Sequence, residues 1–249
     1  MILRRVFITT FEIKLQIVNG TIYLLPVTLG SDDFLKVIPG KVISLTKELR
    51  HFIVEDIRTA RRYLRMIDRD FPIDSTNFYE LNEHSSESDI SDYLDPALKG
   101  FDMGIMSEAG LPGIADPGAM AIALAHRKGL TVSPLSGPSS IIMALIASGL
   151  NGQNFTFNGY LPVKPAERAI KLRELEKAAA TGFAQIFMET PYRNQKMLES
   201  ILTTCHNETL LCIAADISLP SEIIKTKRIA LWKNDPPELK DRLVVFVMQ

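Results

Sequence analysis

Short apolar runs bounded by glycine, proline or polar clusters recur along most of the chain. The clearest is TIYLLPV at 21–27, a β-rich run that Pro26 and the following turn residues bring to an end. Such runs are typical of strands buried on both faces of a sheet. The apolar runs at 42–46 and 51–55 are expected to bracket a helix-like segment. Further strands are predicted at 77–83, 102–107, 130–135, 154–162, 183–189, 209–217 and 242–248.

Amphipathic segments alternate with these runs. In IRTARRYLRMI (57–67), Ile57, Ala60, Leu64 and Ile67 recur at helical spacing, and the arginines group on the other side. Strands that alternate with helices indicate an α/β chain. Further helices are predicted at 86–100, 119–129, 136–149, 166–180 and 193–205.

The strand and helix pattern restarts at a Gly-Pro turn near 133–137. We therefore predict two α/β domains, 20–133 and 134–249, preceded by an N-terminal extension, 1–19. Alternating apolar residues in the extension suit an added strand or a loose leader. It is not expected to be a targeting signal, because charges interrupt its apolar run and no small-residue cleavage site follows.

Composition sets broad limits on these domains. The 249 residues are 46% hydrophobic and 23% charged, which is ordinary for a globular protein. A net charge of −1 argues neither for nor against a nucleic-acid partner. Cys205 and Cys212 are too few for a disulfide framework, so a cytoplasmic location is expected. No apolar run reaches the roughly 20 residues of a membrane span, so no membrane partner is expected.

The loop MSEAGLPGIADPG (106–118) places three glycines and two prolines between a predicted strand and a predicted helix. Ligands of open α/β sheets bind at the carboxyl ends of strands, where glycine allows close backbone approach. A rigid connector fits this composition equally well. The spacing is not a dinucleotide fingerprint, and the chain has no phosphate loop or nucleophile elbow. No metal site is expected, because the histidines are scattered and the cysteines lack paired ligand spacing.

Two groups of basic residues are candidate phosphate contacts. Arg58, Arg62 and Arg65 share one face of the predicted 57–67 helix. A solvated face with Glu55 and Asp56 as partners is favoured over a phosphate patch, because charge runs are usually solvated. Interspersed glutamates weaken the case for the second group, which is Lys164, Arg168, Lys171 and Arg173.

Seven segments occur in a fixed order that resembles a known family. They are VEDIRTARRYL (54–64), ELNEHSS (80–86), MSEAGLPGIADPG (106–118), PLSGPSS (134–140), ALIASGL (144–150), FTFNGYLPVK (155–164) and FMETPYR (187–193). Together they resemble the tetrapyrrole-methylase-like class of S-adenosylmethionine methyltransferases. Within it they are similar to the ribosomal small-subunit RNA 2′-O-methyltransferase I branch. The match covers about residues 20–218.

The resemblance implies two α/β domains with S-adenosylmethionine in the cleft between them, and a homodimer. It also implies which residues bind the cofactor. Pro26 would close the first strand there, and residues of the second domain would complete a pocket begun by the loop. The implied set is Pro26, Glu108, Ala109, Gly110, Pro112, Gly113, Asp116, Ser139, Ser140, Met188 and Ala214.

Methyl transfer to a ribose hydroxyl needs help from the protein, because the hydroxyl is a poor nucleophile. Glu189 is the candidate base or orienter, and Arg193 the candidate partner of a phosphate or alkoxide. The alternative for each candidate is a structural loop charge. Three further candidates lie at the expected edge of the cleft: Asp56 together with Arg58, and Glu83.

Departures from the family pattern fall mostly on the acceptor side. Leu111 replaces a threonine, Tyr192 replaces a histidine, and 215–223 lacks the family's basic residues. The glycine-rich first turn is also altered, at 26–33. The expected function is methylation of a ribose 2′-hydroxyl, with ribosomal RNA or the small ribosomal subunit as partner. A methylase of a tetrapyrrole-like small molecule and a cofactor-binding paralogue without turnover remain the alternatives.

Overall fold

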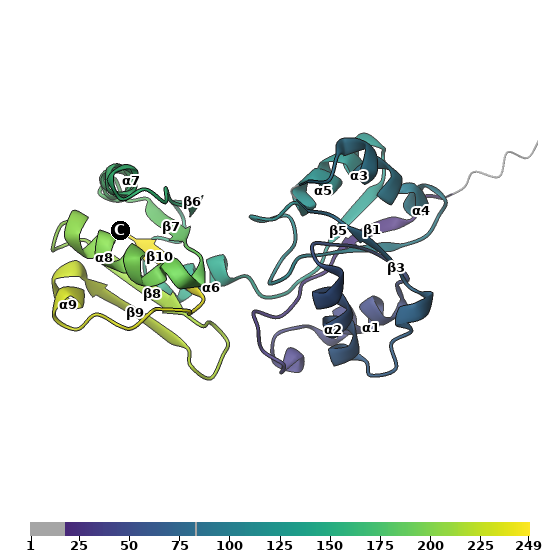
Figure 1. The fold of residues 1–249 in the computed structure, drawn as a ribbon, viewed down its shortest axis with the longest axis horizontal. Coiled ribbons are helices and arrows are strands. Elements are labelled where there is room, and N and C mark those ends of the chain that lie inside the picture. The colour runs from purple at the N-terminus through teal and green to yellow at the C-terminus, as the bar shows by residue number, and fades with distance from the viewer. Residues whose placement is uncertain (1–17, 83) are drawn as a thin grey trace, which may run out of the picture.

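The computed structural model describes residues 18–82 and 84–249, which form two lobes, each built on a five-stranded sheet (Figure 1). The first sheet takes its strands from residues 21–134 and the second from residues 155–248. The strand suggested for the N-terminal extension lies outside the described residues. We keep the predicted division at 133/134 as a proposal.

The first sheet is parallel throughout, with the strand order β3-β2-β4-β1-β5. Its interior strands β2 and β4 are mostly apolar because helices cover both faces of the sheet. In the interior strand β2, for example, Phe52, Ile53 and Val54 are all buried. The strands are β1 (Thr21–Leu24), β2 (His51–Val54), β3 (Asn77–Glu80), β4 (Met103–Met106) and β5 (Thr131–Pro134).

Helices pack on both faces of this sheet (Figure 1). On one face, α1 (Gly40–Glu48) and α2 (Ile57–Ile67) surround Phe52 and Leu64. On the other face, a second cluster forms around Ile53 and Ile105. Its helices are α3 (Glu87–Tyr93), α4 (Asp95–Leu98) and α5 (Gly118–Arg127), and short 3-10 turns occupy Phe34–Lys36 and Ile73–Ser75.

The second sheet is mixed, with the order β6-β7-β10-β8-β9. Only the β6–β7 pairing is parallel among its described pairings. The sheet joins strands from distant parts of the chain, because the C-terminal strand lies between β7 and β8. The strands are β6 (Phe155–Tyr160), β7 (Ala184–Met188), β8 (Leu210–Ala215), β9 (Ile223–Arg228) and β10 (Val244–Met248).

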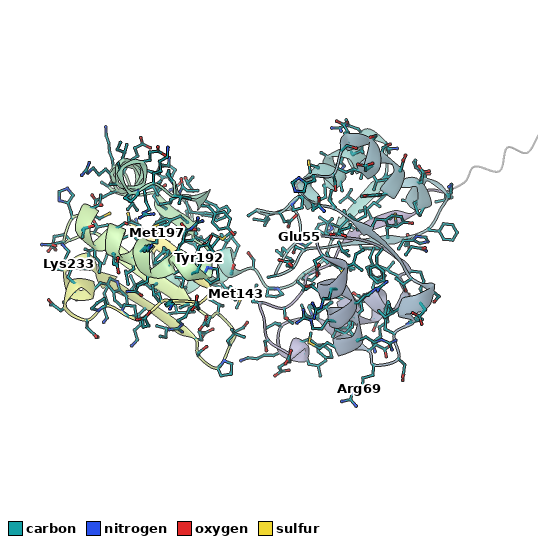
Figure 2. All side chains as sticks on the ribbon, viewed as in Figure 1. Glu55, Arg69, Met143, Tyr192, Met197 and Lys233 are labelled. Carbon is teal, nitrogen blue, oxygen red and sulfur yellow. The ribbon has the colours of Figure 1, made fainter. Side chains whose placement is uncertain are left out.

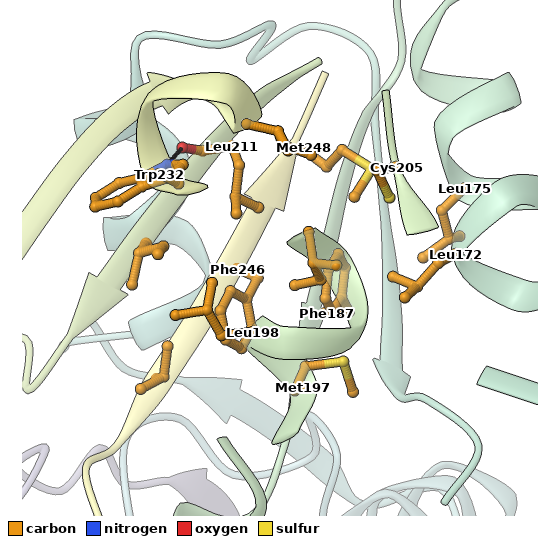
Figure 3. Close-up of a cluster of buried hydrophobic side chains, with 14 of the residues drawn as sticks. Leu172, Leu175, Phe187, Met197, Leu198, Cys205, Leu211, Trp232, Phe246 and Met248 are labelled. Atoms are coloured by element: carbon orange, nitrogen blue, oxygen red, sulfur yellow. Dashed lines mark hydrogen bonds between the residues drawn. The ribbon is translucent and has the colours of Figure 1, made fainter. Parts of the chain in front are cut away.

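Most helices of the second lobe lie on one face of its sheet. There α7 (Pro165–Ala179), α8 (Asn194–Thr204) and α9 (Ile229–Asn234) enclose Phe187 and Phe246, whose rings stack (Figure 3). The Trp232 indole N–H, buried in the same cluster, donates to the Leu211 carbonyl at 2.9 Å. A 3-10 turn, Pro191–Arg193, precedes α8.

The opposite face of the second sheet is covered by α6 (Ser140–Ser148). Its buried Ile141, Ala144 and Leu145 pack with Ile186 and Val245 of the sheet. Leu29, from the loop after β1, belongs to the same cluster. The first lobe therefore contributes to the core of the second.

Two elements differ from the sequence-based expectation. Residues 42–46 lie inside helix α1 instead of preceding a helix-like segment. The Ser44 and Thr46 hydroxyls donate to the carbonyls of Gly40 and Val42, at 3.1 and 2.8 Å, which lets these residues pack within a helix. The structure also adds β9 and α9, which pattern reading missed because β9 is a half-exposed, lysine-bearing edge strand.

Arg168, one of the four residues of the second basic group, is buried and therefore contributes nothing to a surface patch. Its Nε donates to Ser200 Oγ and its Nη1 to the Val163 carbonyl, both at 3.0 Å. Arg168 therefore joins α7 to α8.

No helix among the described residues has the length and apolar character to cross a bilayer.

Candidate functional site

The loop between β4 and α5 is fixed by backbone geometry that only glycine adopts readily. Gly110 and Gly113 have φ values of +73° and +86°. The Val27 N–H donates to the Gly110 carbonyl at 2.9 Å, which attaches the loop to the end of β1. A Cβ on Gly110 would lie 3.3 Å from both a Leu29 methyl and the Pro138 carbonyl oxygen. A side chain at Gly110 would therefore strain the left-handed backbone and press on both neighbours.

Asp116 shapes the same loop from within. Its carboxylate accepts from the Gly113 N–H at 2.8 Å and from the Gly118 N–H at 2.6 Å. Burial raises the pKa of this carboxyl, and the backbone hydrogen bonds act in the opposite direction. Both oxygens are thus used to close the turn that begins α5, which gives Asp116 a structural task besides its place at the cavity.

A cavity of about 300 Å³ lies between the lobes, and we call it the interdomain cavity. The first lobe lines it with the β4–α5 loop, and the second with the start of α6 and the ends of β7, β8 and β10. The structure brings together eight of the eleven residues that the resemblance assigned to the cofactor. These are Glu108, Ala109, Gly110, Asp116, Ser139, Ser140, Met188 and Ala214.

The other three assigned residues, Pro26, Pro112 and Gly113, do not line the cavity. Pro26 instead packs on Gly137, where an added Cβ would lie 2.1 Å from the proline ring. Its carbonyl accepts from the Tyr63 hydroxyl at 3.2 Å. In Gly113, a Cβ would lie 2.8 Å from a methyl group of Ile122. Pro26 and Gly113 therefore do not line the cavity themselves but pack against residues next to it.

Glu189 is a buried carboxylate at the end of β7, and it lines the interdomain cavity. Its Oε1 accepts from the Arg193 guanidinium at 2.6 Å and from the Thr190 N–H at 2.7 Å. Its Oε2 is buried and has no partner within the described residues. Since a buried carboxylate oxygen is costly to leave unpaired, a bound molecule with an N–H or O–H donor would complete the site.

Arg193 is held in the ion pair with Glu189. Its side chain is 23% exposed, and the pairing with Glu189 raises its pKa. The guanidinium also lies 5.3 Å from the centre of the Tyr192 ring. Arg193 is accordingly held in place from two sides and orients Glu189.

A second cavity, of about 260 Å³, lies within the first lobe beside helix α2, and we call it the α2 cavity. Val54, Tyr63 and Met66 give it apolar walls. It shares three lining residues with the interdomain cavity, namely Glu55, Ser107 and Glu108. The two cavities are therefore neighbours with a common wall at the carboxyl ends of β2 and β4.

Glu55 stands on this common wall, on the side of the first lobe that faces the second (Figure 2). Its Oε2 accepts only a long hydrogen bond, 3.4 Å, from the Glu108 N–H. Burial raises its pKa, and the Glu108 and Asp116 carboxylates add to that effect against the hydrogen bond, which lowers it. Sequence reasoning treated Glu55 only as an ion-pair partner for the arginines, although it directly follows a buried strand.

The remaining catalytic candidates have different positions. Asp56 lines the α2 cavity, and its Oδ1 caps α2 by accepting from the Thr59 N–H at 2.6 Å. Hydrogen bonds from the Thr59 side chain and N–H hold the pKa of Asp56 below its usual range. Arg58 is exposed and lines neither cavity. Glu83 lies outside the described residues.

The other arginines of α2 are mostly exposed. Arg61 lies 5.3 Å from the centre of the Phe78 ring, and Arg65 donates to the Arg69 carbonyl. Arg62 is the one arginine that lines the α2 cavity. As far as the described residues go, no group of three or more histidine, cysteine, aspartate or glutamate side chains is arranged to hold a metal ion.

Comparisons with curated proteins give a consistent result. The chain is 31% identical over 235 residues to the ribosomal RNA small subunit methyltransferase I of Vibrio cholerae, covering 92% of this chain and 78% of that protein. It is 30% identical over 208 residues to the protein of the same name from Halalkalibacterium halodurans, covering 84% and 66%. No protein-family model matches the chain.

Solved structures with the same architecture are more distant in sequence. The methyltransferase CobJ superposes with a TM-score of 0.61 at 18% identity, covering 92% of this chain and 93% of that one. Uroporphyrin III C-methyl transferase from Thermus thermophilus gives 0.56 at 17% identity, covering 92% and 97%. These similarities concern the fold, and they confirm the expected arrangement of two α/β domains.

Proposed function

Because the chain belongs to the ribosomal RNA small subunit methyltransferase I family, we propose that it transfers a methyl group from S-adenosylmethionine to a ribose 2′-hydroxyl of small-subunit ribosomal RNA. The observation that carries the proposal is an alignment over 92% of the chain to a protein of that name. A cavity that both lobes line, with eight of the eleven residues assigned to the cofactor around it, also supports the proposal.

The interdomain cavity fits the cofactor in its chemistry. Gly110 lines the cavity, and its left-handed backbone holds the loop against Leu29 and Pro138. The unpartnered Glu189 Oε2 can accept from an amino or hydroxyl group of the cofactor. Ser139 and Ser140, at the N-terminus of α6, offer a helix end that favours a carboxylate. When bound, the cofactor supplies a methyl carbon activated by its positively charged sulfur.

The chain's own contribution to the reaction is chiefly positioning. Holding the acceptor oxygen about 3 Å from the methyl carbon, in line with the bond that breaks, supplies much of the acceleration. Of the two roles predicted for Glu189, we propose that of orienter, because Arg193 and Thr190 already occupy one of its oxygens. Arg193 then acts as a positioning residue, not as a partner of the substrate.

The test has two steps. Calorimetry should first show S-adenosylmethionine binding with a micromolar or lower Kd. Purified small ribosomal subunits lacking the modification should then accept tritiated methyl groups at a linkage that resists alkaline hydrolysis, because a 2′-O-methyl group removes the attacking hydroxyl. Absence of cofactor binding contradicts the proposal as a whole. Label that alkali releases as ordinary nucleotides contradicts ribose methylation.

A tetrapyrrole-like acceptor is the alternative that the two solved structures suggest by their fold. The α2 cavity disfavours an acceptor that carries several carboxylates, because Asp32, Glu55, Asp56 and Glu108 line it. A panel of tetrapyrroles assayed in parallel with ribosomal subunits separates the two acceptors. Cofactor binding with no acceptor labelled would instead indicate a paralogue without turnover.

The family also carries expectations about assembly and location. We propose that the protein acts as a homodimer in the cytoplasm, where assembling ribosomal subunits are available. Light scattering on the purified chain tests the first point, since a mass near the 27.8 kDa of a single chain would contradict it. Localisation of the tagged protein in cell fractions tests the second.

A further inference from the structure

The α2 cavity adjoins the interdomain cavity. Glu55, Ser107 and Glu108 form the wall that the two cavities share. A molecule in the interdomain cavity and another group in the α2 cavity would therefore meet at this wall. The residues assigned to the cofactor line the first cavity, and the second has no proposed occupant.

The lining of the α2 cavity indicates what kind of group it accepts. Val54, Tyr63 and Met66 supply apolar surface for a flat ring. Its charged residues are four acids, Asp32, Glu55, Asp56 and Glu108, and a single arginine, Arg62. This excess of negative charge disfavours a phosphate and favours an uncharged ring that carries N–H donors. A nucleobase has this combination of properties.

Enzymes that do chemistry on a base turn that nucleotide out of the helical stack into a fitted pocket, and a pocket beside a reacting ribose can receive a base in the same way. We infer that the α2 cavity receives the base of the target nucleotide, turned out of the RNA, so that its ribose lies at the shared wall and Glu55 accepts the proton of the 2′-hydroxyl. This inference rests on the proposed function, and it assigns to Glu55 the role of base that the sequence suggested for Glu189.

The proposed step transfers one methyl group and one proton. The 2′-hydroxyl oxygen forms a bond to the methyl carbon as the carbon–sulfur bond of the cofactor breaks. The electron pair of that bond remains on sulfur, which loses its positive charge. The hydroxyl proton passes to the Glu55 carboxylate. Glu55 suits this task because, within the described residues, it has no ion-pair partner and only one long hydrogen bond.

The groups facing Glu55 set its pH dependence. Glu108 and Asp116 face it from the β4–α5 loop, Asp56 from the start of α2, and Tyr160 from β6. Burial and the three carboxylates raise the pKa of Glu55 against the Glu108 N–H. Methyl transfer should therefore fall on the acid side of a pKa above the ordinary range of glutamate, because protonated Glu55 accepts no proton.

The first experiment fills the α2 cavity. Met66→Trp adds bulk inside it, and Met120→Trp makes the same change at an exposed position on α5 that lines neither cavity. We expect Met66→Trp to keep its affinity for S-adenosylmethionine within about twofold, and to lose about 100-fold or more in kcat/KM on small ribosomal subunits. Met120→Trp should match the wild type in both. If Met66→Trp lowers Tm by several degrees, the smaller Met66→Phe replaces it.

A fluorescence measurement reports the base directly. Once the labelled nucleotide is mapped, 2-aminopurine replaces that base in an RNA fragment, and its fluorescence rises when it leaves the stack. The wild-type protein with cofactor should raise the 2-aminopurine fluorescence, and the Met66→Trp variant, whose α2 cavity is filled, should not. An equal rise with both proteins would overturn the assignment of the cavity.

The second experiment concerns Glu55 itself. Glu55→Gln should slow single-turnover methyl transfer by about 10²–10³-fold and remove the acid limb of its pH profile, with cofactor and RNA affinities unchanged. The exposed Glu48→Gln on α1 is the matched control. If the wild type methylates ribose but neither Glu55→Gln nor the filled variant differs from its control, this inference fails and the proposed function stands. If the wild type methylates no ribose, the proposed function fails first.

Discussion

A single substitution at Gly110 is expected to decide whether S-adenosylmethionine binds. The left-handed backbone of Gly110 and its two neighbours at 3.3 Å leave no space for a β-branched side chain. We predict that Gly110→Val weakens S-adenosylmethionine binding at least about 100-fold, because the loop must move to accommodate the methyl groups. Calorimetry measures the loss, and circular dichroism checks the fold. Gly152→Val is the control, since a Cβ there meets nothing within 4 Å. Normal affinity in Gly110→Val would contradict the assigned position of the loop.

The Glu189–Arg193 pair allows a second prediction at the residue scale. Arg193→Met leaves the Glu189 carboxylate buried without its cation, and we expect the free energy of unfolding to fall by about 2–3 kcal/mol. The pair of Arg228 and Glu208 provides the comparison, because both its side chains are largely exposed. Arg228→Met should cost less than about 1 kcal/mol. Urea denaturation of both variants measures the two costs, and equal costs would contradict the special status of the buried pair.

Helix α2 illustrates how an element gives a charged residue its task. Asp56, considered from sequence as a catalytic candidate, caps this helix through the Thr59 N–H. We predict that Asp56→Ala lowers the free energy of unfolding by about 1 kcal/mol at pH 7.

The cap should also make this cost depend on pH. The pKa of Asp56 in the folded protein lies below the ordinary 3.8, so the capped carboxylate stabilises the fold fully above that value. The contribution disappears as the pH falls through the lowered pKa. The difference between wild type and Asp56→Ala should therefore shrink in urea titrations below pH 3.8. A difference that stays constant down to acid pH would show that the cap does not require the charge.

The elements that sequence patterns predicted well are those with strong local signals. Helix α2 matches its prediction at both ends, because its apolar spacing and its capping aspartate are local. Residues 42–46 misled because Val42, Ile43 and Thr46 favour strands, whereas their burial against the core selects a helix. The β4–α5 loop was predictable as a tight turn from its glycines, whereas its assignment to the cofactor came from the family resemblance and stays a prediction. Glu55 was not predictable, because its position at a shared wall depends on β2 lying beside β4, which no local pattern specifies.

At the scale of the whole molecule, the interdomain cavity should couple the two lobes. S-adenosylmethionine at 100 times its Kd should stabilise the protein by about 2.7 kcal/mol. Because both lobes line the cavity, hydrogen exchange should slow together in residues 107–117 and 188–190. Mass spectrometry of exchanged peptides measures this. Protection confined to one lobe would contradict a cofactor site between them.

The contact of Pro26 with Gly137 has a consequence for the distance over which the reaction takes place. Gly137 lies in the segment that carries the chain from the first sheet toward the second, and its backbone is pressed against the proline ring. We expect this contact, which lies outside both cavities, to help set the spacing of the lobes. A side chain at Gly137 would push the two lobes apart. A displacement of about 1 Å between the reacting groups can cost about 100-fold in rate. The distance that the methyl group must cross is therefore expected to depend on the contact of Pro26 with Gly137, which lies away from the methyl group itself.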